Sequence, residues 1–109
     1  MKNNELITHS TTTLLMRTEQ VGKLQLPGIP GEFEVLSFKE RQNRPRLLVV
    51  HESWHQHKPW EYVTPVAVVN VEQNGSARIN NQIDKTQSSH SKIGEEVLAI
   101  YHRYKQVHA

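Results

Sequence analysis

The chain contains no cysteine, so disulfide bonds and thiolate metal sites are excluded. Long apolar runs are also missing. Near the N-terminus the longest is residues 14–16, too short for the apolar core of a secretory signal. No segment approaches the roughly 18 apolar residues that a membrane-spanning helix needs. These absences favour a soluble, cytoplasmic protein that does not insert into a membrane.

Two further absences exclude common kinds of enzyme. Asp84 is the only aspartate, and no serine lies in the strand-turn-helix pattern of a hydrolase nucleophile, so Ser/His/Asp catalysis is not expected. The five glycines match neither of the glycine-rich fingerprints that bind nucleotide phosphates. With 109 residues, the chain has the length of one domain, and we predict a single domain over 1–109 with a frayed segment at 1–10.

The distribution of apolar and β-branched residues predicts mainly strands in the first 80 residues. In the segment 32–38, Phe33, Val35 and Ser37 alternate with residues that face the other way. Two prolines and two glycines make 27–31 a loop. Pro65 has no N–H to donate, so we place it at a sheet edge or a bulge. The predicted strands are 11–18, 24–26, 32–38, 47–50 and 61–71.

The end of the chain predicts a hairpin followed by a helix. Asn74 and Gly75 suit a type I′ turn, which indicates a hairpin over 66–80. Ser91 is a candidate N-cap for a helix over 92–105. Its apolar residues recur at helical spacing. We therefore predict an α+β fold, a small antiparallel sheet of four or five strands with the C-terminal helix packed on one face. The expected core contacts join Val97, Ile100, Tyr101 and Tyr104 of the helix to Phe33, Val35 and Val68 of the sheet.

One short motif carries possible metal chemistry. Residues 51–55 read His-Glu-Ser-Trp-His, which matches H-E-x-x-H. On an α-helix, His51 and His55 would share a face and hold zinc, and Glu52 would act as the general base. The neighbouring valines favour a strand instead. A strand would line up His51, His55 and His57 as a non-catalytic metal site, or as surface histidines that bind nothing.

The second candidate site is basic. The loop 39–46 contains Lys39, Arg41, Arg44 and Arg46, although the net charge of the chain is only +2. Arginine suits phosphate oxygens, and aromatic rings suit stacked bases. Trp54, Lys58 and Trp60 follow soon after, so we expect the loop tip and these residues to form one continuous surface.

From the sequence we favour a small non-enzymatic binding or regulatory protein without a cofactor. It would contact nucleic acid, or a protein that handles nucleic acid, through the basic loop and the neighbouring aromatic residues. The alternative is a minimal zinc-dependent hydrolase that uses the segment 51–55. A third possibility is a purely structural subunit or a homodimer.

Overall fold

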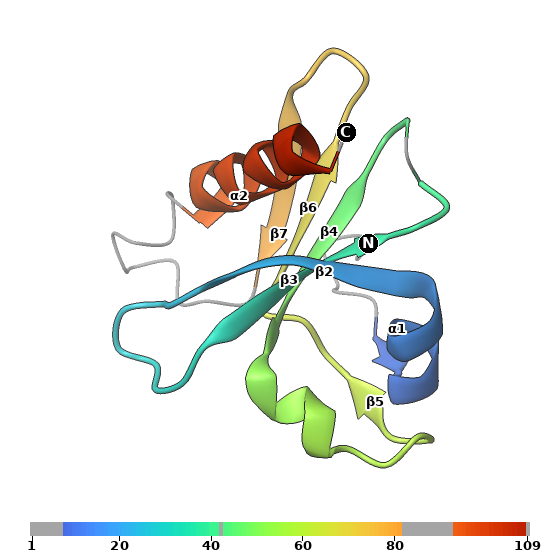
Figure 1. Ribbon diagram of the computed structural model, residues 1–109. Coiled ribbons are helices and arrows are strands. Elements are labelled where there is room, and N and C mark those ends of the chain that lie inside the picture. Colours follow the sequence, from blue (N-terminus) through green and yellow to red (C-terminus); the bar gives the residue numbers. More distant parts are fainter. Residues whose placement is uncertain (1–7, 42, 82–92, 109) are drawn as a thin grey trace, which may run out of the picture.

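The computed structural model describes residues 8–41, 43–81 and 93–108, and it confirms the predicted α+β architecture (Figure 1). A five-stranded antiparallel sheet has the strand order β2-β3-β4-β6-β7, and β1 pairs with β5 in a separate two-stranded sheet. The elements are β1 (His9–Ser10), α1 (Thr11–Arg17), β2 (Thr18–Leu24), β3 (Phe33–Phe38), β4 (Arg46–His51), the 3-10 helix η1 (Glu52–Gln56), β5 (Tyr62–Val63), β6 (Ala67–Val71), β7 (Ala77–Asn81) and α2 (Ile93–Val107).

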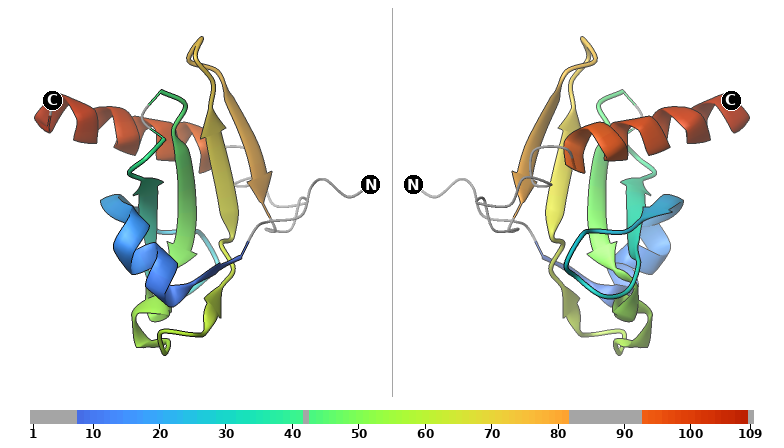
Figure 2. Two further views of the ribbon diagram at one scale, coloured as in Figure 1. Left: turned by 90° about the vertical axis from the view of Figure 1, so that its right-hand side faces the viewer. Right: turned by 90° about the vertical axis from the view of Figure 1, so that its left-hand side faces the viewer.

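The central strands divide their side chains between two cores, one on each face of the sheet. Neighbouring residues of a strand point to opposite faces, and the register aligns Val35 with Val49 and Val49 with Ala67. Odd-numbered residues of β3, β4 and β6 therefore form the core beneath α2. Even-numbered residues form the core beneath α1, η1 and β5. Figure 2 shows α2 crossing the upper part of the sheet and α1, η1 and β5 at its lower part.

Helix α2 confirms the prediction of a C-terminal helix on one face of the sheet. Val97 and Tyr101 are buried with Phe33 and Val35, and Ile100 and Tyr104 pack against the same core. The helix lies so close to β2 that a Cβ atom at Gly22 would come within 2.2 Å of Ile100. The proposed N-cap Ser91 and residue 92 lie outside the described residues.

The placement of Val68 beneath α2 is wrong. Val68 pairs with Leu48, which pairs with Leu36, so all three point away from α2. They belong to the core that contains Leu14 and Trp54. The neighbouring residue Val69 takes the expected place beneath α2, because a shift of one residue along a strand changes the face.

The predicted strand at 11–18 is also wrong, since Thr11–Arg17 forms helix α1. The hydroxyl of Ser10 caps this helix by accepting a hydrogen bond from the N–H of Thr13 at 3.2 Å. The hydroxyls of Thr11 and Thr12 donate to the carbonyls of Glu61 and Pro59. These capping and tertiary hydrogen bonds outweigh the preference of three consecutive threonines for a strand.

The following segments agree with prediction in part. Leu24 ends the seven-residue strand β2, so the predicted short strand at 24–26 was misplaced. Pro65 lies between β5 and β6 and divides the single strand expected at 61–71. The hairpin of β6 and β7 is confirmed, but its turn is not type I′, because Gly75 has a positive φ of 91° and Asn74 does not.

Part of the N-terminal segment is held in place. We expected residues 1–10 to fray. Residues 1–7 lie outside the described residues, but His9 and Ser10 form β1, which pairs with Val63 and Tyr62 of β5. The described helices include none that combines the length and the apolar character needed to cross a membrane.

Candidate functional site

Six basic side chains lie at one end of the five-stranded sheet, the end at the top of Figure 1. Three segments meet there: the loop between β3 and β4, the turn between β6 and β7, and the C-terminal part of α2. Arg41 is common to three adjoining pockets, one at the loop tip and two beside it. We call this region the basic end and define it by Lys39, Arg41, Arg44, Arg46, Arg78 and Lys105.

Carboxylates neutralise only part of the basic end. Glu72 lies 3.8 Å from Arg44 and 3.6 Å from Arg78, so these two arginines share one negative charge. Glu40 pairs with Arg17 of α1. Lys39, Arg41, Arg46 and Lys105 make no ion pair within the described part of the chain, and their charges remain available to an anion.

Positive charges at this end act on one another. The Nε of Arg46 donates to Oδ1 of Asn70 at 3.0 Å, which fixes the guanidinium beside β6. Burial, and then the charge of Arg41, lower the pKa of Arg46. Burial, followed by the charges of Arg46 and Arg17, lowers the pKa of His9. A bound anion would relieve this repulsion.

The aromatic half of the predicted surface lies elsewhere. Strand β4 carries Arg46 at one end and His51 at the other, about 17 Å apart at the ordinary rise of a strand. The segment between η1 and β5, which contains Trp60, lies at the far end, at the bottom of Figure 1. Trp60 is 70% exposed, and the Nζ of Lys58 lies 5.7 Å from its ring centroid. The structure therefore does not bring Trp60 and Lys58 to the basic end.

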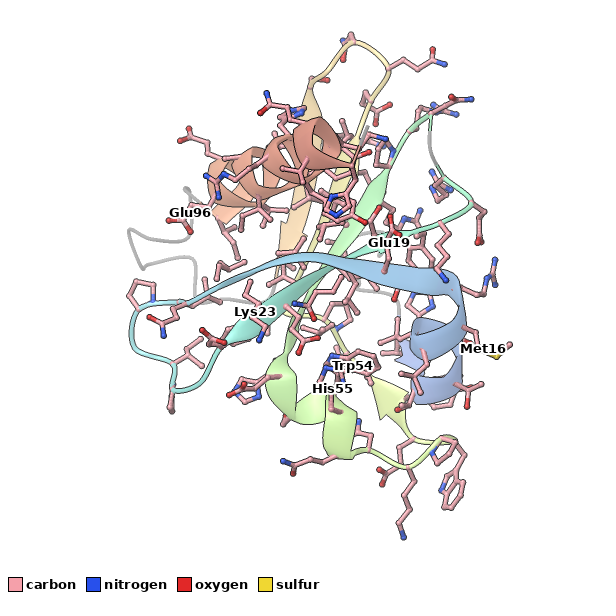
Figure 3. All side chains as sticks on the ribbon, in the orientation of Figure 1. Met16, Glu19, Lys23, Trp54, His55 and Glu96 are labelled. Carbon is pink, nitrogen blue, oxygen red and sulfur yellow. The ribbon has the colours of Figure 1, made fainter. Side chains whose placement is uncertain are left out.

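Trp54 is a core residue and not an exposed stacking platform. It is only 4% exposed, and its Nε1–H donates to the carboxylate of Glu34 at 2.9 Å. The same carboxylate, whose side chain is 5% exposed, lies 2.7 Å from Nε2 of His55. Figure 3 shows Trp54 and His55 next to each other below the sheet. The Glu34 side chain of β3 thus holds η1 against the sheet through its contacts with Trp54 and His55.

The H-E-x-x-H segment does not form the α-helix that the zinc alternative requires. His51 ends β4, and residues 52–56 form a 3-10 helix, in which positions three apart share a face. Nδ1 of His51 accepts from the N–H of Ser53 at 3.1 Å, and Nε2 lies 3.0 Å from the carbonyl of Pro30. His51 and His55 therefore face different partners, Pro30 and Glu34.

The three-histidine strand is not formed either, because η1 replaces the strand after His51. Within the described residues, no group of three or more histidines and carboxylates is arranged to hold a metal ion. Glu52, the candidate general base, instead accepts a hydrogen bond from the backbone N–H of Glu32 at 3.3 Å.

A cleft beside the basic end was not expected from the sequence. It lies between α2 and the strands β2 and β3, with a volume of about 550 Å³. The sequence predicts Tyr101 and Tyr104 as core contacts of the helix. Their spacing along the helix places both tyrosines toward the sheet. Nothing in the sequence indicated that Lys39 and Arg41 would line the same cleft. The lining consists of Glu19, Ser37, Phe38, Lys39, Arg41, Tyr101, Tyr104, Lys105 and His108.

No family model matches the chain, and no curated protein or solved structure is significantly similar to it. The geometry of the molecule is therefore the basis for a functional proposal.

Proposed function

We propose that this protein is a non-enzymatic nucleic-acid-binding protein whose basic end contacts the phosphate backbone. The observation that carries the proposal is the gathering of six cationic side chains from three separate segments around Arg41. Guanidinium groups donate to phosphate oxygens in pairs, and surface lysines add charge.

The location of the charge supports the proposal more than its total amount. A net charge of +2 attracts a polyanion only weakly over a long distance. At the basic end, however, six cations stand beside three carboxylates, Glu19, Glu40 and Glu72, and Glu40 is paired with Arg17. Local contacts must therefore supply the affinity, and the affinity must fall as salt concentration rises.

A titration with fluorescently labelled oligonucleotides tests the proposal. The triple variant Arg41→Gln, Arg44→Gln and Arg46→Gln should bind more weakly than the wild type. The slope of log affinity against log salt should become less steep by about two units, because each lost phosphate contact changes it by roughly 0.7 to 0.9.

A second triple variant controls for net charge. Lys23→Gln, Lys58→Gln and Arg103→Gln removes the same number of charges at positions that line none of the three pockets of the basic end, and it should retain the wild-type slope. Equal losses in the two variants, or no binding of any oligonucleotide at low salt, would contradict the proposal.

A further inference from the structure

The cleft beside the basic end has the composition of a binding site for a small aromatic ligand with an adjacent anion. Its volume of about 550 Å³ falls in the range of roughly 300–1,000 Å³ that is usual for such ligands. Aromatic rings come from α2, from His108 directly after it and from the end of β3. Cations come from both α2 and the β3–β4 loop, and one carboxylate comes from β2. The cleft thus combines stacking surfaces with cations.

The rings of Tyr104 and His108 form an ordered stacking surface in the cleft. Their centroids are 4.1 Å apart, and the planes differ by 23°. Nδ1 of His108 lies 3.0 Å from the carbonyl of Tyr104, which holds the imidazole in this orientation. His108 is exposed, so a flat base can continue the stack without displacing a core residue.

Glu19 is the acidic residue in the cleft. Figure 3 shows it projecting from β2 on the side of α2. It lines the cleft together with Tyr101 and Tyr104. Burial, followed by the negative charge of Glu19, raises the pKa of both phenols. A carboxylate has two acceptor oxygens and repels phosphate. Its presence among cations therefore favours a ligand that brings N–H donors together with its phosphates.

An unpaired base meets these requirements. In a duplex the Watson–Crick edges are occupied, whereas a single strand leaves them free. Guanine offers two adjacent donors on this edge, N1–H and the N2 amine, which match the two oxygens of a carboxylate. Adenine and cytosine offer one amine each.

We propose that the cleft binds an unpaired base of a single-stranded nucleic acid, preferring guanine, while the basic end holds the flanking phosphates. Glu19 accepts hydrogen bonds from the base, and the stacked rings of Tyr104 and His108 hold its face. Lys39, Arg41 and Lys105 contact the adjacent phosphates. This inference rests on the proposed function and adds a preference for single strands.

Three oligonucleotides of equal length test the inference: a thymidine strand with one central guanine, the same strand with inosine in its place, and a blunt duplex. Inosine lacks only the N2 amine. The wild type should bind the guanine strand most tightly. His108→Ala should weaken binding of the single strands about tenfold and leave both duplex affinity and the salt slope unchanged. His102→Ala, on an exposed part of α2, should leave all three affinities unchanged.

Glu19→Gln tests whether Glu19 recognises the base through hydrogen bonds. Loss of a negative charge should strengthen binding of all three oligonucleotides, but the preference for guanine over inosine should decrease. If single strands and duplex bind equally in an arginine-dependent manner, the inference is wrong and the proposed function stands. An undiminished guanine preference in Glu19→Gln would also overturn it. If nothing binds, the proposed function itself has failed.

Discussion

At the scale of single residues, Glu34 has the most side-chain partners among the buried polar residues that the structure describes. Its carboxylate accepts from the indole of Trp54 and pairs with His55, while its backbone belongs to β3. A carboxylate this deeply buried is tolerated because both partners satisfy it. The contact ties η1 to the sheet, and it explains why Trp54 is unavailable to a ligand.

We predict that Glu34→Ala lowers the free energy of unfolding by about 2–4 kcal/mol, because it leaves the buried indole N–H without an acceptor. Glu34→Gln should cost less, since its amide oxygen still accepts from the indole. Urea denaturation of each variant gives the measurement. Glu32→Ala is the matched control: this residue is half-exposed and lies 3.7 Å from Lys23, so its loss should cost no more than about 0.5 kcal/mol. Equal costs at the two positions would contradict the role of Glu34.

Only part of the candidate site could be predicted from individual residues of the sequence. The run of cations at 39–46 was visible in the sequence, and the structure places these residues together. The burial of Trp54 was not visible, because its partner Glu34 is 20 residues away in the chain and becomes its neighbour only through the pairing of β3 and β4. The same holds for the cleft, in which Glu19 and Tyr104 come from opposite ends of the chain.

At the scale of elements, α2 was the easiest to predict and α1 the hardest. A 15-residue helix with one apolar stripe gives a clear periodic signal. The seven residues of α1 are too few for such a signal, and their helical state depends on Ser10 and on carbonyls of residues 59 and 61. Short elements of this kind are fixed by tertiary contacts, which a local pattern does not contain.

The packing of α2 leads to a second stability prediction. Val97 is fully buried against the sheet, so Val97→Asp places an unpaired charge in the core and should destabilise the protein by about 3 kcal/mol or more. Ala99→Asp on the exposed side of the same helix should cost only the difference in helix propensity, about 0.7 kcal/mol. Thermal denaturation followed by circular dichroism compares the two variants. A melting temperature of Val97→Asp as high as that of Ala99→Asp would show that α2 is not docked as described.

At the scale of the whole molecule, the alternation of side chains in three strands links the two cores. Leu47 and Val49 point toward α2, whereas Leu48 and Val50 point toward α1 and η1. The sequence predicted that alternation within a strand but not the register between strands, which decides whether Val68 or Val69 faces α2. Register depends on pairing over a long distance, and it became known only with the structure.

Because β3, β4 and β6 belong to both cores, we predict that the two faces unfold together in one transition. The chain has two tryptophans, so Trp60→Phe leaves Trp54 as a single fluorescent probe of the core beneath α1 and η1. Far-UV circular dichroism reports on α2 and the sheet. The urea midpoints from the two signals should coincide, as in a two-state transition. Adding Val97→Ala, which opens a cavity on the opposite face, should destabilise the protein by about 1–3 kcal/mol and lower both midpoints by the same amount. A fluorescence midpoint that stays in place while the dichroism midpoint falls would show that the α1 face keeps its structure when α2 is lost, and that the shared strands do not couple the two cores.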